Sequence, residues 1–119
     1  MNYNIKGTGV SITPEIREYL EKKLAALEKF VVQKDLARAD VELQFLQGEA
    51  RMYRAELMLH GQEKILRAEA RGTTLHEALD LSVGDMTREV TQLKKKRIHV
   101  VRRSAAKVKD MLRGLRDRF

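Results

Sequence analysis

Residues 37–71, ARADVELQFLQGEARMYRAELMLHGQEKILRAEAR, decide the fold because apolar and polar side chains alternate along most of this stretch. Alternation with a period of two is typical of half-buried strands. It predicts three strands in succession, the first over residues 37–47. Short turns at residues 47–50 and at Gly61-Gln62 separate them, so the strands should form an antiparallel meander. The buried face should carry Ala39, Val41, Leu43, Phe45, Tyr53, Ala55, Leu57, Leu59, Leu66, Ala68 and Ala70.

A fourth strand and a helix precede the meander. Residues 2–9 alternate in the same way, with Tyr3 and Ile5 on one side. Thr13-Pro14 then predicts a helix start, because threonine is a good N-cap and proline suits the first helical position. Apolar residues at helical spacing continue this helix to about residue 30.

A second helix follows the meander. Thr74 and Glu77 fit a capping box, in which each side chain accepts a hydrogen bond from the other residue's backbone N–H. Gly84 interrupts the helix at a cost of about 1 kcal/mol relative to alanine, and close passage of the first helix would explain it. The buried side of this helix should carry Leu75, Leu79, Ser82, Met86, Val90 and Leu93.

The order of elements is β-α-β-β-β-α, which predicts an α+β fold. We expect a two-layer sandwich, in which two helices cover one face of a four-stranded sheet and the other face stays polar. Residues 1–97 should form this domain. Residues 98–119 should be a basic, partly helical C-terminal tail, with Val108, Leu112, Leu115 and Phe119 as an apolar stripe. A helix this short is marginal alone, so a partner should order it.

The positive charge is concentrated at one end of the chain. The net charge is +7, yet residues 94–119 hold 11 of the 24 Lys and Arg against two acids, and the first 93 residues carry a net charge of −2. Such an asymmetry is typical of a nucleic-acid-binding tail, and a solvated charge run is the alternative. No apolar run is long enough to span a membrane, and no signal peptide or cysteine is present. A cytoplasmic protein without a membrane or DNA partner is the simplest interpretation.

The sequence offers no catalytic constellation, so we do not expect an enzyme. His60, His76 and His99 are scattered and form no metal-binding pair, and no cofactor or metal is expected. The function that the sequence does support is phosphate binding by the basic segment, residues 94–119. Each Lys or Arg that replaces a counterion on RNA adds affinity without recognising the base sequence. Tyr53 could stack on a base, but it lies with the inward residues, so we predict a core position.

The order of strands and helices, the spacing of the motifs and the basic C-terminal segment together resemble the ribosome hibernation-promoting factors. This family includes ribosome-associated inhibitor A. The strongest local similarity is residues 68–80, AEARGTTLHEALD, where the family has an Ala-x-Ala strand end, a turn and an Ala-Ile-Asp-like triplet. Asn4-Ile5-x-Gly7 near the start is also similar. The resemblance covers roughly residues 1–97 and implies a short member, because only about 20 residues follow the second helix.

Two positions depart from the family pattern. His76 stands where a tyrosine is common early in the second helix, and Asp85 stands where a lysine is common two turns later. A ribosomal contact at Asp85 is therefore in doubt.

The resemblance implies binding to the small ribosomal subunit, and hence to 16S rRNA, in the channel between head and body. Occupancy of the messenger path and of the A and P sites would block translation and preserve inactive ribosomes. Some short members join ribosomes into dimers with the aid of a small helper protein, whereas others hold single ribosomes. A small helper protein is therefore a candidate partner. The competing hypothesis is that the tail excludes a helper, which would favour single ribosomes. The predicted rRNA-binding residues are Arg88, Lys94, Lys95, Lys96 and Arg97, with Lys22, Lys23 and Lys29 on the first helix as lesser candidates and Arg102 and Arg103 as an extension.

Two other interpretations remain open. A double-stranded RNA-binding module has a similar helix and three-strand layout, and it would bind any A-form duplex by shape. Alternatively, the apolar stripe of the tail would dock on a protein or an anionic membrane.

Overall fold

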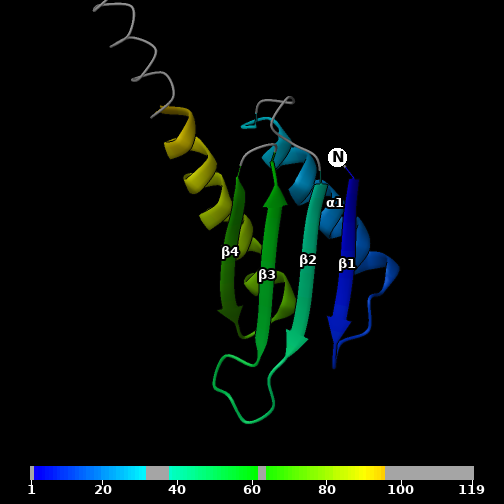
Figure 1. Ribbon diagram of the computed structural model, residues 1–119. Coiled ribbons are helices and arrows are strands. Elements are labelled where there is room, and N and C mark those ends of the chain that lie inside the picture. The colour runs from blue at the N-terminus through cyan, green and yellow to red at the C-terminus, as the bar shows by residue number, and fades with distance from the viewer. Residues whose placement is uncertain (1, 32–37, 62–63, 96–119) are drawn as a thin grey trace, which may run out of the picture.

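The computed structural model describes residues 2–31, 38–61 and 64–95. Figure 1 shows a single layer of strands with two helices behind it. The elements are β1 (Asn2–Thr8), α1 (Pro14–Glu28), β2 (Arg38–Phe45), β3 (Tyr53–His60) and β4 (Ile65–Gly72), followed by a second helix over residues 75–95. The predicted α+β fold, β-α-β-β-β-α, is therefore confirmed.

The sheet is mixed, with strand order β1-β2-β3-β4. β1 runs parallel to β2, and α1 makes the crossover between them, while β2, β3 and β4 form the expected antiparallel meander. The register aligns Ile5 with Val41, Val41 with Leu57, and Leu57 with Ala68. Because side chains alternate along a strand, this register places Ile5, Val41, Leu57 and Ala68 on the face that the helices cover. Met58 and Ile65 alternate onto the opposite face, and Phe45, predicted to be buried, is exposed at the end of β2.

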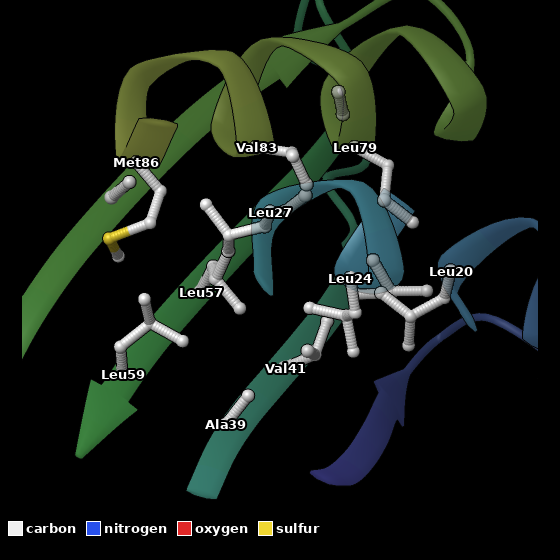
Figure 2. Close-up of a cluster of buried hydrophobic side chains, with 14 of the residues drawn as sticks. Leu20, Leu24, Leu27, Ala39, Val41, Leu57, Leu59, Leu79, Val83 and Met86 are labelled. Carbon is white, nitrogen blue, oxygen red and sulfur yellow. The ribbon is translucent and has the colours of Figure 1, made fainter. Parts of the chain in front are cut away.

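The core lies between the sheet and the two helices (Figure 2). Leu20, Leu24 and Leu27 of α1 are almost fully buried. They share the core with Leu79 and Met86 of the second helix. Burial of a leucine side chain contributes about 1.5–3 kcal/mol, so this interface holds the helices on the sheet. Tyr53 is half-buried against the core, as the sequence predicted.

Both helices begin at a threonine cap. The Thr13 hydroxyl accepts a hydrogen bond from the Ile16 N–H at 3.2 Å, and the Thr74 hydroxyl accepts one from the Glu77 N–H at 3.1 Å. The second half of the predicted capping box is replaced, because the Glu77 carboxylate accepts from the Thr73 hydroxyl at 2.9 Å. Gly72 is required before this helix, since a Cβ there would lie 2.7 Å from the Ala78 nitrogen.

Some boundaries differ from the prediction. α1 ends at Glu28 with Lys29 as its C-cap, two residues before the expected end. β2 ends at Phe45, two residues before the predicted end. The predicted turn at Gly61-Gln62 and the predicted tail at residues 98–119 lie partly or wholly outside the described residues.

The explanation expected for Gly84 is wrong, because a Cβ built there meets no atom of the described structure within 4 Å. Gly84 is an exposed residue in the middle of the second helix. It therefore lowers the stability of the fold only through the backbone entropy that glycine loses on folding. Gly84→Ala is therefore expected to raise the free energy of unfolding by about 1 kcal/mol, measured by urea denaturation.

Gly48→Ala is the matched control for Gly84→Ala. Gly48 also lies in open space, but its φ of 81° is costly for any residue with a Cβ. This variant is expected to lose about 1 kcal/mol. A loss of stability in Gly84→Ala would contradict the open-space interpretation.

Candidate nucleic-acid interface

The cations of the fold divide into those with a partner and those without. Within the described residues, six Lys and Arg side chains have no ion pair and no side-chain hydrogen bond: Lys6, Lys29, Arg51, Lys64, Lys94 and Lys95. A cation with a partner must give up that interaction to bind a phosphate. The unpaired cations are therefore the first candidates for an RNA contact.

Four of these cations lie at one end of the molecule. Lys29 caps the C-terminal end of α1, Lys64 precedes β4, and Lys94 and Lys95 occupy the last described turn of the second helix. The ends of both helices and the start of β4 lie together at the top of Figure 1. We call these four residues the basic end. Cations are favourable there because the C-terminal ends of helices carry partial negative charge.

A groove opens beside the basic end, between β4 and the second helix. Residues 64–67 line it on the strand side, and Glu89, Gln92 and Leu93 line it on the helix side. We call it the β4 groove. Ile65 is 55% exposed, although it is a large apolar residue. The groove thus places apolar surface directly beside unpaired positive charge.

Arg88 points from the same helix but is not free. Its guanidinium forms an ion pair with Asp85, three residues earlier on the helix. Both side chains are well exposed, so this pair is weak and a phosphate could displace it. Asp85, one of the two residues that depart from the family pattern, thus forms an ion pair with Arg88, a predicted rRNA-binding residue.

Lys22 and Lys23 on α1 are engaged within the fold. Lys22 lies 3.7 Å from Glu18, and the Lys23 ammonium lies 2.9 Å from an Asp80 carboxylate oxygen. The Tyr19 hydroxyl donates to the same Asp80 oxygen at 2.5 Å, so Asp80 links α1 to the second helix. Lys23 stabilises the helix pair and does not lie with the basic end.

These contacts shift the pKa values of the linked groups. Burial alone would raise the pKa of Asp80, but the hydrogen bonds from Tyr19 and Lys23 outweigh it and lower the pKa. The hydrogen bond to Asp80 is the main reason that the pKa of Tyr19 and the pKa of Lys23 are raised. The carboxylate is therefore ionised and the ammonium charged throughout the physiological pH range.

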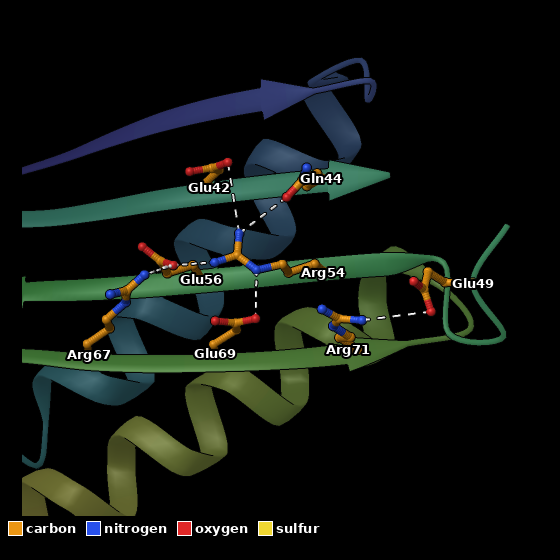
Figure 3. A network of polar contacts seen from close by, with 8 residues as sticks. All are labelled: Glu42, Gln44, Glu49, Arg54, Glu56, Arg67, Glu69 and Arg71. Atoms are coloured by element: carbon orange, nitrogen blue, oxygen red, sulfur yellow. Dashed lines mark hydrogen bonds and ion pairs between the residues drawn. The ribbon is translucent and has the colours of Figure 1, made fainter. Parts of the chain in front are cut away.

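The open face of the sheet uses its charges internally. Arg54 donates to Glu69 at 2.8 Å and also to Glu56, and Arg67 donates to Glu56 at 2.7 Å (Figure 3). Glu42 lies 3.9 Å from Arg54. The hydrogen bond to Glu69 raises the pKa of Arg54, and the same bond lowers the pKa of Glu69. Positive and negative charges largely cancel, so this face is a poor surface for a polyanion.

A second charge cluster lies at the start of β2 on the same face. Burial raises the pKa of Asp40, but hydrogen bonds from His60 at 2.7 Å and from Asn4 at 3.3 Å lower it overall. Arg38 adds an ion pair at 3.5 Å. The positive charge of Arg38 is thus also balanced by a neighbouring carboxylate, that of Asp40.

Other kinds of site find no support in the described part of the chain. Over residues 2–31, 38–61 and 64–95, no group of three His, Asp or Glu side chains could hold a metal ion. None of the helices described is long and apolar enough to cross a membrane.

The structure brings together only some of the predicted contacts. Lys29, Lys94 and Lys95 lie at the basic end, whereas Arg88, Lys22 and Lys23 have intramolecular partners. Sequence reasoning missed Lys64, because a single lysine in a hairpin carries no signal until β4 is placed beside the second helix. The remaining predicted residues lie outside the described ranges: Lys96, Arg97, Arg102 and Arg103.

Comparison with known proteins places this fold in a family. The profile described as Sigma 54 modulation protein / S30EA ribosomal protein matches residues 3–98. The chain belongs to this family. Family membership confirms the resemblance seen in the sequence, while a short form stays a prediction.

Curated relatives of this family member include two bacterial proteins called ribosome hibernation promotion factor. The one from Bacillus subtilis is 27% identical over 96 residues, and the one from Deinococcus radiodurans is 28% identical over 92 residues. The matches cover 81% and 77% of this chain but 50% and 48% of those proteins. The chain therefore spans about half the length of the curated relatives that it matches.

Solved structures give the same fold. The N-terminal domain of Thermus thermophilus Protein Y is 31% identical, with a TM-score of 0.67, and the match covers 78% of this chain and 99% of that domain. A ribosomal subunit interface protein from Coxiella burnetii matches with a TM-score of 0.67 over 80% of this chain and 99% of its own. At 18% identity, the second match supports the fold alone.

Proposed function

We propose that this chain binds the small ribosomal subunit in the channel that holds the messenger and the A- and P-site transfer RNAs. Occupancy of this channel would block translation and preserve the inactive ribosome. The observation that carries the proposal is the basic end: Lys29, Lys64, Lys94 and Lys95 lie at the same end of the described structure and have no partner among the described residues. The chain that carries them is related to ribosome hibernation promotion factors.

The proposed mechanism is electrostatic occupancy, in which no covalent bond is made or broken. The second helix is anchored to the sheet by buried residues up to Val90, so Lys94 and Lys95 extend from a rigid body. The sequence continues with Lys96 and Arg97 and, farther on, with more cations. Each cation that replaces a counterion on 16S rRNA adds affinity, and a preorganised helix loses little entropy on binding.

The proposal is tested by co-sedimentation with purified small subunits, large subunits and whole ribosomes at near-physiological salt. Excess free duplex RNA serves as the competitor. We expect saturable binding near one protein per small subunit that survives the competitor. Binding that the duplex abolishes, or that is equal on both subunits, would instead support a general double-stranded RNA-binding module.

A second arm tests the interpretation in which the tail docks on a protein or a membrane. Leu112→Ala/Leu115→Ala removes two residues of the apolar stripe without changing charge. If the stripe is not required, this variant binds small subunits as the unmodified protein does. Loss of translation inhibition with subunit binding intact would favour the tail as the functional surface.

Asp85 is expected to weaken ribosome binding, because it competes with phosphate for Arg88. Asp85→Asn keeps the side-chain shape, removes the ion pair and frees the guanidinium. We expect affinity for small subunits to rise about two- to fivefold at physiological salt, measured by titration with labelled protein.

Glu18→Gln is the matched control for Asp85→Asn, since it also removes one acid that is paired with a helix cation. It changes the net charge equally but acts on Lys22, away from the basic end. An equal gain in both variants would show that only net charge matters and would contradict a specific role for Arg88.

A further inference from the structure

We propose that the β4 groove holds one unstacked nucleotide base of the bound RNA, while phosphates on either side of that base contact the basic end. This inference rests on the proposed function, since it takes ribosomal RNA as the partner. It adds a base-binding site to a surface that otherwise binds only the RNA backbone.

The lining of the groove suits a flat ring that is apolar on its faces and polar on its edges. Leu66 and Leu93 are half-buried, and Ile65 presents 55% of its surface to solvent. Apolar side chains can pack against the face of a base. Gln92 supplies an amide that can both donate to and accept from a base edge, so one side chain serves different bases.

The charges indicate where the phosphates lie. Lys64 lines the groove without a partner among the described residues, and Lys94 and Lys95 follow directly after the helix residues that line it. Arg67 also lines the groove, but it donates to Glu56. Unpaired positive charge therefore lies at Lys64 in the groove and beside it at the end of the second helix, where it can contact the RNA backbone.

The helix side of the groove is unsuited to a phosphate. Glu89 contributes a carboxylate to this side, and a carboxylate repels a phosphate but accepts hydrogen bonds from base N–H groups. The open face of the sheet is also exposed and rich in polar groups. There, Arg54 and Arg67 form ion pairs with glutamates of the same face. The β4 groove thus combines neighbouring unpaired cations, an apolar wall and hydrogen-bonding side chains, as an RNA nucleotide requires.

The test compares two RNA-like octamers that differ by one base. One octamer carries tetrahydrofuran spacers at every position, and the other carries a single base at its centre. Fluorescence anisotropy with the full chain measures both affinities, and the ratio isolates the contribution of the base. Stacking on an aromatic ring is worth about 1–3 kcal/mol per base, and packing on the aliphatic wall of this groove should lie at the lower end, so we expect the single-base octamer to bind about 5-fold more tightly.

Two groove variants should lower that ratio without changing backbone binding. Ile65→Ala and Gln92→Ala are each expected to reduce the ratio at least threefold and to leave the affinity for the spacer octamer within twofold. Leu81→Ala and Gln47→Ala are matched controls, because both residues are exposed and neither lines the groove. Thermal melting confirms that each variant is folded.

The outcomes separate this inference from the proposed function. Equal affinity for both octamers, or an unchanged ratio in the groove variants, would overturn the base-binding site. Small subunits are measured in parallel by co-sedimentation. Failure to bind them would overturn the proposed function whatever the octamer ratio, and binding with a ratio of one would leave the proposed function standing without the groove.

Discussion

Replacing Lys94 and Lys95 together by alanine is expected to weaken binding to small ribosomal subunits roughly 10- to 30-fold at physiological salt. Both side chains are exposed and have no partner among the described residues. Their loss should therefore cost no intramolecular contact, and the fold should be unchanged. The whole effect should come from counterions that are no longer released from the RNA.

The salt dependence distinguishes this cause from a change in shape. If about six phosphates are neutralised, the logarithm of the affinity should fall with the logarithm of salt with a slope of roughly −4 to −5. The double variant should flatten that slope by about 1.5, because each contact contributes roughly 0.7–0.9. Titrations with small subunits at several salt concentrations measure both the slope and the affinity.

Lys6→Ala/Arg51→Ala is the control for this variant. It also removes two exposed cations that lack partners in the described structure, but Lys6 lies on β1 and Arg51 in the loop between β2 and β3, away from the basic end. We expect less than a threefold change in affinity. An unchanged slope in the lysine variant, or equal losses in both variants, would move the binding surface elsewhere.

Much of the fold could be predicted because local signals and burial agree. The alternation in β2, β3 and β4 matches the face that the helices bury, and both threonine caps lie where the sequence placed them. The ends of elements were less predictable, since they depend on side-chain competition. Glu77 bonds to Thr73 in preference to completing the capping box, and a periodic pattern cannot reveal that choice.

The site was only partly predictable, for a physical reason. A count of Lys and Arg identifies the basic terminus, but it does not reveal which cations are already paired. Lys23 and Arg88 looked like RNA contacts in sequence, and both have an acidic neighbour in the structure. Lys64 looked unremarkable, and the fold places it beside the last turns of the second helix. Pairing and groove formation depend on contacts between elements distant in sequence.

Replacing Arg54 by methionine is expected to lower the free energy of unfolding by about 1–3 kcal/mol at pH 7. The Arg54 side chain is 14% exposed and that of Glu56 is 10% exposed, so neither charge is well solvated. Methionine retains most of the apolar packing but leaves Glu42, Glu56 and Glu69 without the cation that they share. Like charges close together disfavour ionisation and destabilise the folded state. Urea denaturation with two-state analysis measures the loss.

The same variant should respond to pH in a defined direction. In the unmodified protein, the hydrogen bond from Arg54 lowers the pKa of Glu69, so its stabilising contribution is present above the usual glutamate pKa and is lost as the pH falls through the lowered value. In Arg54→Met this hydrogen bond is absent, so the pKa of Glu69 should return towards its ordinary value and this contribution to stability should disappear. The difference in stability between the two proteins is therefore expected to be largest at pH 7 and to shrink as the pH falls below the usual glutamate pKa.

Arg71→Met is the matched control for the network. Arg71 lies on the same face, but its side chain is 48% exposed and its Nη1 lies 4.0 Å from a Glu49 carboxylate oxygen, a long ion pair. An exposed pair of this kind contributes little, so we expect a change below about 0.5 kcal/mol and little dependence on pH. A similar loss in both variants would show that methionine itself is poorly tolerated on this face. A loss in Arg54→Met that did not shrink on acidification would show that packing, and not charge, makes Arg54 necessary.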